Sequence, residues 1–380
     1  EMEAIYLDYN ATTPVDERVL EKMLPCFSKK FGNAASNTHA FGWTAKEAVE
    51  IAREKTSALI GCEPRELYFT SGATEGVNLI IKGVYESYSK KGKHIITYAT
   101  EHKAVLDTCK YLQTIGADVE ILPVERDGLP DLDLFKKSLR ADTILAIAMF
   151  ANNETGVLFP IAEMGDICRG HDVIFFSDTT QAAGKVLFDV KESNIDCCVL
   201  SAHKMYGPKG VGAVYISRKN PRVSVQAQLH GGGHEGGMRS GTLNVPGIVG
   251  LGEACHIAEK EMWDNGILLS SLRTRLEQQL ESDGSVMING SIKNRLNNTS
   301  NLTFKAIKSE DLIKEIRPVA VAAGSACTAA LPQPSHVLLA MGLTEKEAYN
   351  SVRFSLGKYT TAHEIDLTIE KIRKIISSKI

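Results

Sequence analysis

Five short polar segments carry side chains that could do chemistry together. Taken singly, each has a plain explanation: a loop histidine is more often capped or exposed than catalytic, an aspartate ahead of a helix usually caps it, and a lysine after a strand is usually solvated. The amide-rich segment could be an ordinary turn. The five segments are Thr70-Ser-Gly-Ala-Thr-Glu75, Thr100-Glu-His102, Asn152-Asn-Glu-Thr-Gly156, Ser177-Asp178 with Gln181, and Ser201-Ala-His-Lys204.

Taken together, these segments supply the parts of a pyridoxal phosphate site. Gly72 permits a tight turn, so that backbone N–H groups and the Thr74 hydroxyl could hold a phosphate at the start of a helix. Lys204 could form the Schiff base, and Asp178 could pair with the pyridinium nitrogen. The combination therefore predicts this cofactor more strongly than any one segment does.

The pattern of the chain places all five segments directly after predicted strands. Strands that alternate with helices indicate an α/β fold with a mainly parallel sheet covered on both faces. In such sheets ligands bind beyond the carboxyl ends of the strands, so the five segments should share one rim. The predicted strands are Glu66–Thr70, His94–Tyr98, Thr143–Phe150, Val173–Ser177, Ile195–Ser201 and Val211–Ser217, and predicted helices include Thr44–Ile60, Val77–Ser89 and Ala104–Ile115.

The pattern changes after about Glu259, where a charged helix is predicted over Glu259–Glu281. The last helix should open with the capping box of Thr361-Ala-His-Glu364 and bury one side of isoleucines. We therefore place a domain boundary near residue 260. The prediction is a large domain of residues 16–260 and a smaller α+β domain formed by residues 1–15 together with 261–380.

Composition excludes several classes of protein. Lysine plus arginine total 43 and aspartate plus glutamate 46, so 43 − 46 gives a net charge of −3, without the basic excess of a nucleic-acid binder. The longest clean apolar run, around Ile144–Ala151, is far shorter than the ~18 residues that span a bilayer. Eight cysteines without a Cys-x-x-Cys pair suggest neither a disulfide scaffold nor a metal cage, so we expect a reducing, cytoplasmic compartment and no metal.

Over nearly its whole length the sequence resembles the cysteine desulfurases of the class V aminotransferase family, the nitrogen-fixation and iron–sulfur-cluster type. This family has the fold-type I architecture of pyridoxal phosphate enzymes. The resemblance is carried by Tyr6-Leu-Asp-Tyr-Asn-Ala-Thr-Thr-Pro14, Thr70–Glu75, Thr100–His102, Asn152–Glu154, Ser201–Lys204, His230-Gly-Gly-Gly-His234 through Arg239-Ser-Gly-Thr242, Gly324-Ser-Ala-Cys327 and Arg353-Phe-Ser355.

The resemblance implies a role for each matched residue. Lys204 would carry the cofactor, Asp178 would pair with its ring nitrogen and keep that nitrogen protonated, and His102 would stack on the ring and exchange protons. Gln181 would bond the ring oxygen, while Asn153 and Arg353 would bind the substrate carboxylate, for which the planar fork of an arginine is suited. The phosphate would be held by Ala73, Thr74, Ser201 and His203, with Thr242 reaching across from the second subunit of a homodimer.

The resemblance further implies a nucleophile, Cys327, in the small-residue run Ala322-Ala-Gly-Ser-Ala-Cys-Thr-Ala-Ala330. Because this run has little bulk for packing, we expect a loop that could swing. The implied reaction takes sulfur from L-cysteine, leaving L-alanine and a persulfide on Cys327 for an iron–sulfur scaffold or another acceptor. The other cysteines are expected to be structural.

Other functions fit the sequence less well. A selenocysteine lyase or sulfinate desulfinase usually presents its cysteine in an Arg-x-Gly-His-His-Cys context, and a plain aminotransferase does not need Cys327. A non-catalytic assembly protein would not need Lys204, Asp178 and His102. His230 and His234 lie in a glycine-rich loop rather than on a helix, so zinc binding is not expected there.

Overall fold

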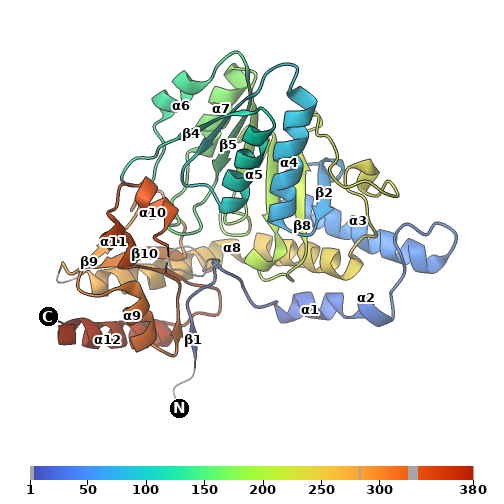
Figure 1. The fold of residues 1–380 in the computed structure, drawn as a ribbon. Helices are drawn as coiled ribbons and strands as arrows, with labels where there is room; N and C mark the ends of the chain where they lie inside the picture. The colour runs from blue at the N-terminus through green and yellow to red at the C-terminus, as the bar shows by residue number, and fades with distance from the viewer. Residues whose placement is uncertain (1–3, 282–283, 324–332, 380) are drawn as a thin grey trace.

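The computed structural model describes residues 4–281, 284–323 and 333–379. Its larger part is built around a seven-stranded sheet with the strand order β2-β8-β7-β6-β5-β3-β4 (Figure 1). β8 is antiparallel to both of its neighbours, whereas the strands from β7 to β4 are parallel, so β2 ends at the same edge as they do. The strands are β2 (Leu67–Thr70), β3 (His94–Tyr98), β4 (Asp118–Leu122), β5 (Thr143–Met149), β6 (Ile174–Asp178), β7 (Cys197–Ser201) and β8 (Gly212–Ile216).

The mainly parallel α/β architecture predicted from the sequence is confirmed, and all six predicted strands are present with ends shifted by at most two residues. The strand β4 was missed. It lies at the edge of the sheet and pairs with β3, and its Asp118 is exposed while Glu120 is only partly buried. An edge strand with polar residues lacks the continuous apolar run that reveals a buried parallel strand.

Helices cover both faces of the sheet because successive residues of each strand point to opposite sides. In β7, Cys197 and Val199 pack beneath α4 and α5, whereas Cys198 and Leu200 pack against the face covered by α3, α7 and α8. The helices of this part are α1 (Glu17–Met23), α2 (Pro25–Ser28), α3 (Ala40–Ile60), α4 (Ala73–Tyr88), α5 (Lys103–Thr114), α6 (Leu132–Ser138), α7 (Ile161–Gly170) and α8 (Val245–Leu280).

The helix predicted to begin at Glu259 in fact begins at Val245, and as α8 it runs beneath the seven-stranded sheet, with α1, α2 and α12 below it in the view of Figure 1. Its first turns were missed because they contain several glycines, which are poor helix formers. The structure explains one of them: a Cβ on Gly252 would lie 2.6 Å from Cα of Ala52 on α3. The glycine therefore allows the two helices to pack closely.

A smaller part packs against the second half of α8. Its three-stranded sheet, β12-β10-β9, is antiparallel, and the N-terminal strand β1 pairs with β11. The capping box between Thr361 and Glu364 forms as predicted, and one side of the last helix buries Ile365, Ile369, Ile372 and Ile376. The elements are β1 (Ile5–Tyr6), β9 (Val286–Ile288), β10 (Thr299–Phe304), β11 (Val319–Ala320), β12 (Ser351–Ser355), α9 (Ser309–Glu315), α10 (His336–Ala340), α11 (Glu345–Tyr349) and α12 (Ala362–Lys379).

The proposed boundary near residue 260 falls inside α8 rather than in a linker. The helix belongs to one apolar core up to Ile257 and to another from Leu269 onward, and Ile5 and Leu7 of the N-terminal segment join the second core. The division into residues 16–260 and residues 1–15 with 261–380 stays a prediction. Among the described residues, no helix has the length and apolarity needed to cross a membrane.

Candidate active site

A cavity opens at the carboxyl edge of the seven-stranded sheet, where the ends of β2, β3, β5, β6 and β7 meet the smaller part of the molecule. Ten of the residues singled out in the sequence line it, from segments that are far apart along the chain. Thr242 does not line this cavity, and Cys327 lies outside the described residues. The ten are Ala73, Thr74, His102, Asn153, Asp178, Gln181, Ser201, His203, Lys204 and Arg353.

Lys204 ends the short 3-10 turn η2 (Ala202–Lys204), which directly follows β7. Its Nζ donates hydrogen bonds to the carbonyl oxygens of Asn10, at 2.6 Å, and Ala11, at 2.9 Å. Burial and the nearby positive charge of Arg353 lower the pKa of Lys204 to about 8, against the smaller opposing effect of Asp8 and Asp178. The amine is therefore much easier to deprotonate than an ordinary lysine.

Asp178 is the last residue of β6, and its side chain is buried. Its Oδ1 accepts hydrogen bonds from the backbone N–H of Thr180, at 3.0 Å, and from the Thr180 hydroxyl, at 2.6 Å. Among the described residues, no donor bonds to Oδ2. One carboxylate oxygen is thus fixed by the protein while the other is left to pair with a cationic group in the cavity.

The start of α4 has the features of a phosphate site. The helix begins at Ala73, four residues earlier than predicted, and its N-cap is Gly72, which has no side chain to cap the free N–H groups. Such a helix start favours an anion because its N–H groups and dipole point outward. Glu75 accepts a bond from the N–H of Ser71 and pairs with Arg239 at 2.7 Å, which ties this turn to the glycine-rich loop.

His102 is the N-cap of α5 and also lines the cavity, so it has both the capping role and the site position considered for it from the sequence. Its Nδ1 accepts a hydrogen bond from the N–H of Ala104 at 3.0 Å. A neutral imidazole in this arrangement carries its proton on Nε2. Desolvation lowers the pKa of His102, while the charge of Asp178 opposes this effect, so the ring is mostly neutral at pH 7.

Arg353 lies on β12 and brings a guanidinium from the smaller part of the molecule into the cavity. It donates to Oδ1 of Asp8, at 2.7 Å, and to the carbonyl oxygen of Asn153, at 3.0 Å. Its buried Nε has no partner among the residues that the structure describes. Two of its five N–H donors are used in these bonds, so the guanidinium is held in place at the cavity wall with donors left over.

Further predicted residues belong to the lining of the cavity or lie near it. Nδ1 of His203 lies 3.0 Å from the Thr12 hydroxyl, and burial lowers the pKa of this histidine to about 4, so it is neutral. Ser201 is buried at the end of β7. Thr242 is exposed just before α8, and its expected contact across subunits stays a prediction.

Sequence reasoning missed two features, one in the site and one beside it. Asn10 and Ala11, whose carbonyls hold Lys204, entered only as members of a matching motif, because a backbone carbonyl leaves no trace in residue type. Lys185, whose Nζ donates to Oε1 of Gln181 at 2.7 Å, was not singled out at all. Its position four residues after Gln181 was the only available signal.

The fold and the cavity together define a class of protein. Within the part of the chain that the structure describes, the sheet brings three features to one rim: the half-buried Lys204, Asp178 with one carboxylate oxygen free, and the start of α4, which has no side-chain cap. Pyridoxal phosphate requires these groups for its binding. The residues present therefore fit this cofactor. The class is that of the fold-type I pyridoxal phosphate enzymes.

Comparisons with known proteins identify the family. Residues 5–368 match the family model described as aminotransferase class-V. The chain is 52% identical to "Cysteine desulfurase IscS" from Anaeromyxobacter sp. (strain Fw109-5), over 98% of this chain and 93% of that protein. Two solved structures are similar over most of the chain. One is a "NIFS-like protein" (TM-score 0.92, 38% identity, 99% of this chain and 100% of that chain), and the other is described as "SspA in complex with cysteine" (TM-score 0.82, 37% identity, 94% and 100%).

The chain therefore belongs to the class-V aminotransferase family and is a pyridoxal phosphate-dependent enzyme of the cysteine desulfurase type.

Proposed function

We propose that this enzyme removes sulfur from L-cysteine, releasing L-alanine and leaving the sulfur as a persulfide on Cys327. The observation that carries the proposal is the meeting of Lys204, Asp178 and Arg353 in one cavity, since a base, a charge partner for the cofactor and a carboxylate-binding group are all needed. Pyridoxal phosphate, when bound, supplies an electron-withdrawing ring that stabilises negative charge at the substrate Cα.

Cofactor binding is assigned to the residues that line the same cavity. Asp178 would pair with the ring nitrogen through Oδ2, and Gln181 would bond the ring oxygen. The uncapped N–H groups of Ala73 and Thr74 would hold the phosphate, because an anion there would replace the missing helix cap. Asn153, Ser201 and His203 complete this binding set, and Thr242 joins it from a second subunit.

The protein's own groups then move the protons. The free amine of Lys204, with a pKa of about 8, is matched to taking a proton from Cα near neutral pH. Arg353 and Asn153 orient the substrate by its carboxylate. His102, neutral with its proton on Nε2, exchanges a proton with the leaving sulfur or the alanine fragment.

The sulfur step is assigned to Cys327. Its thiolate attacks the substrate sulfur, the Cβ–S bond breaks, and the electron pair of that bond remains with the alanine fragment, which takes up a proton. Thiolate is required for attack, and burial raises the thiol pKa of each of the seven described cysteines, to about 12 for Cys62, Cys109 and Cys255. These seven are therefore poor nucleophiles, which supports Cys327 by elimination.

The reaction is tested by one experiment in which both products are measured in the same sample. The enzyme loaded with pyridoxal phosphate is given L-cysteine and a thiol reductant, and alanine and sulfide are counted together. Equal yields are expected. Pyruvate or another keto acid in place of alanine would contradict the desulfurase reaction and favour transamination, and selenocysteine turnover without sulfide release from cysteine would favour a lyase for selenium.

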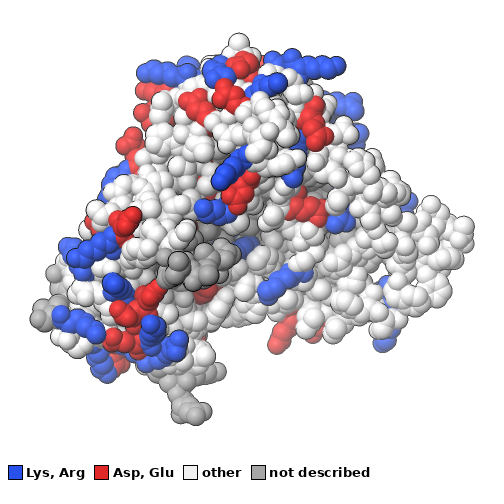
Figure 2. All heavy atoms as spheres, viewed as in Figure 1, with Lys and Arg blue, Asp and Glu red and all other residues white. Residues whose placement is uncertain are grey.

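We further propose that the enzyme is a homodimer. Four aromatic side chains on α2, on the following loop and at the start of α3 are more than half exposed, in a region of Figure 2 with few charged residues. Exposed apolar surface of this kind marks a protein interface. A second copy is the expected occupant because Thr242 is outside its own cavity. The four aromatic residues are Phe27, Phe31, Phe41 and Trp43.

The dimer is tested by sedimentation of the parent protein and of the Phe31→Glu/Trp43→Glu variant. A mass of two chains is expected for the parent and of one chain for the variant. A parent that sediments as a monomer with a full complement of cofactor would overturn the proposal.

We also propose a reducing, cytoplasmic compartment, which the seven unpaired cysteines of the described chain support, and an iron–sulfur scaffold or other acceptor protein as the recipient of the sulfur.

A further inference from the structure

Lys185 lies in the turn that follows β6, where it joins a chain of hydrogen bonds leading to the catalytic amine. Its Nζ donates to Oε1 of Gln181 at 2.7 Å, and Nε2 of Gln181 donates to the carbonyl oxygen of Asn10 at 3.0 Å. That same carbonyl accepts from Nζ of Lys204 at 2.6 Å. Two half-buried amines are thus linked through one amide and one carbonyl.

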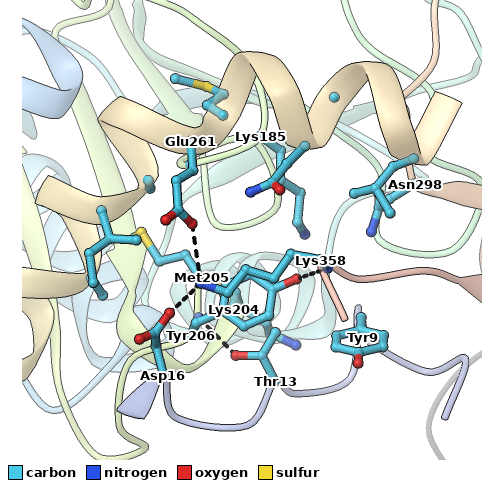
Figure 3. A pocket seen from close by; sticks show the side chains of 18 of the residues that line it. Tyr9, Thr13, Asp16, Lys185, Lys204, Met205, Tyr206, Glu261, Asn298 and Lys358 are labelled. Atoms are coloured by element: carbon cyan, nitrogen blue, oxygen red, sulfur yellow. Dashed lines mark hydrogen bonds and ion pairs between the residues drawn. The ribbon is translucent and has the colours of Figure 1, made fainter. Parts of the chain in front are cut away.

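The two amines occupy opposite sides of this link. Lys185 lines a second, neighbouring cavity, whereas Gln181 lines the active-site cavity and Lys204 lines both (Figure 3). Lys185 therefore does not line the cavity assigned to the cofactor, and any effect it has must pass through Gln181 or through its charge.

The amide of Gln181 is held in one of its two orientations. A flipped amide would place its oxygen against the carbonyl oxygen of Asn10 and its NH2 group against the Lys185 ammonium, two unfavourable contacts in place of two hydrogen bonds. In the observed orientation Nε2 has two hydrogens, and Asn10 takes one of them. The second is left for an acceptor in the active-site cavity.

We propose that Lys185 is a positioning residue, which fixes Gln181 so that its second amide N–H meets the ring oxygen of the bound cofactor. The inference rests on the proposed function, and it concerns a residue to which that function gives no role. A bond accepted at Oε1 also makes the amide N–H a stronger donor, because hydrogen bonds in a chain polarise one another. With the cofactor bound, this donor would draw electron density from the ring oxygen. The oxygen would then attract a proton on the Lys204 nitrogen less strongly, so that proton would be lost at a lower pH.

Other charges face Lys185 as well. Lys204 and Arg353 repel it, and together with burial they lower the pKa of Lys185 to about 7, with burial the larger cause. Asp16, Glu261 and Lys358 line the same neighbouring cavity. A test must therefore separate an effect through Gln181 from an effect of charge alone.

The experiment is a double-mutant cycle read from the visible absorbance of bound pyridoxal phosphate as the pH is changed. Lys185→Met should raise the midpoint of the absorbance change by about half a pH unit, or about threefold in proton affinity. When Lys185→Met is made in a Gln181→Met background, it should not shift the midpoint further. Lys185→Arg keeps a donor-only head group, for which the neighbouring cavity leaves room, and should restore the parent midpoint. Lys55→Met, which removes another partly buried lysine, one paired with Glu253, should leave it unmoved.

Each outcome either supports or contradicts the positioning role of Lys185. An unchanged midpoint in Lys185→Met, or an equal shift in the Gln181→Met background, would overturn the positioning role. Melting curves confirm folding, and Lys185→Ala carries the same test if the methionine variant does not fold. A parent protein that shows the absorbance but releases no sulfide from L-cysteine would refute the proposed function alone, whereas a parent that binds no cofactor would refute both.

Discussion

Lys204 shows how its surroundings change the chemistry of a side chain. An ordinary lysine has a pKa of about 10.4 and is almost fully protonated at neutral pH. At the rim of the sheet, burial and the charge of Arg353 lower this value to about 8, and the carbonyls of Asn10 and Ala11 hold the amine in place. A lysine that follows a strand is usually solvated and protonated. The surroundings of Lys204 instead make it a candidate base.

The lowered pKa predicts how fast the cofactor-free enzyme takes up pyridoxal phosphate. Only the free amine can react with an aldehyde, so the rate constant should rise with pH and level off above about 8. Stopped-flow absorbance measures the profile. Lys204→Ala should show neither uptake nor turnover, and Arg353→Met should move the midpoint upward because a repelling charge is removed. A parent midpoint near 10 would show that the amine is not perturbed.

Cys327 provides a second prediction at this scale. Cys327→Ser should keep the bound cofactor and its absorbance but lose persulfide formation, with turnover reduced at least a hundredfold, since a hydroxyl is a far weaker nucleophile than a thiolate at neutral pH. Trapping with an alkylating reagent and mass mapping locates the sulfur. Cys62→Ser is the matched control and should retain activity. Sulfane sulfur on Cys62 in the parent enzyme would make the assignment wrong.

Among the elements, the contact between α3 and α8 supports the sheet whose strand ends form the site. α8 packs its first turns against α3 on the sheet face opposite α4 and α5, and Gly252 permits the approach. Parallel pairing brings the carboxyl ends of the strands to one rim, and the helices packed on both faces support the sheet in that arrangement. Close packing of these two helices is therefore part of what positions Asp178 and Lys204.

Gly252→Ala tests this packing. Alanine is the better helix former by about 1 kcal/mol, yet its Cβ would meet the backbone of Ala52, so a net loss of about 1–3 kcal/mol in unfolding free energy is expected. Urea denaturation measures it. Gly170→Ala, at the end of α7 with open space around the added Cβ, is the control and should be neutral or slightly stabilising. Equal effects of the two substitutions would show that helix propensity alone governs both.

Across the whole molecule, an ion cluster joins parts that lie far apart in the sequence. Asp16, the N-cap of α1, pairs with Lys358 just after β12 and with Arg18 at 2.8 Å, and Glu261 of α8 completes the group (Figure 3). Hydrogen bonds from Arg18, and then from Lys358, hold the pKa of Asp16 well below its usual range. The cluster connects the smaller part of the molecule to α1 and α8 beside Lys204.

Asp16→Asn isolates the charge, since asparagine caps a helix as well as aspartate. Among the described residues, the substitution leaves Lys358 with Glu261, at 3.5 Å, as its carboxylate partner, and it should cost about 3 kcal/mol at pH 7. Because the folded-state pKa of Asp16 is lowered, its contribution is present above the unfolded value near 3.9 and is lost as the pH falls below it. The gap between parent and variant should therefore close in acid, as measured by denaturation at several pH values.

The exposed pair of Lys91 and Asp172 provides the control, and Asp172→Asn should cost less than about 1 kcal/mol. A gap for Asp16→Asn that stays constant from pH 7 to pH 3 would show that the carboxylate charge is not what stabilises the fold.

The sequence by itself determined the α/β fold class, six strands of the larger sheet, the rim on which the polar segments meet, and the family. Period and strand order along the chain carry the fold class, the strands and the rim, because every parallel strand must present its carboxyl end to the same edge. The family follows from the resemblance of the matched motifs. It also predicted the capping box of Thr361 and Glu364, since that contact is local.

Only the tertiary structure decided what depends on neighbours distant in the chain. The start of α8, the pKa of Lys204, the carbonyls that hold its amine and the link from Lys185 through Gln181 all arise from packing or from backbone atoms. Burial, desolvation and hydrogen-bond geometry are properties of assembled surroundings, and no residue type or spacing encodes them alone.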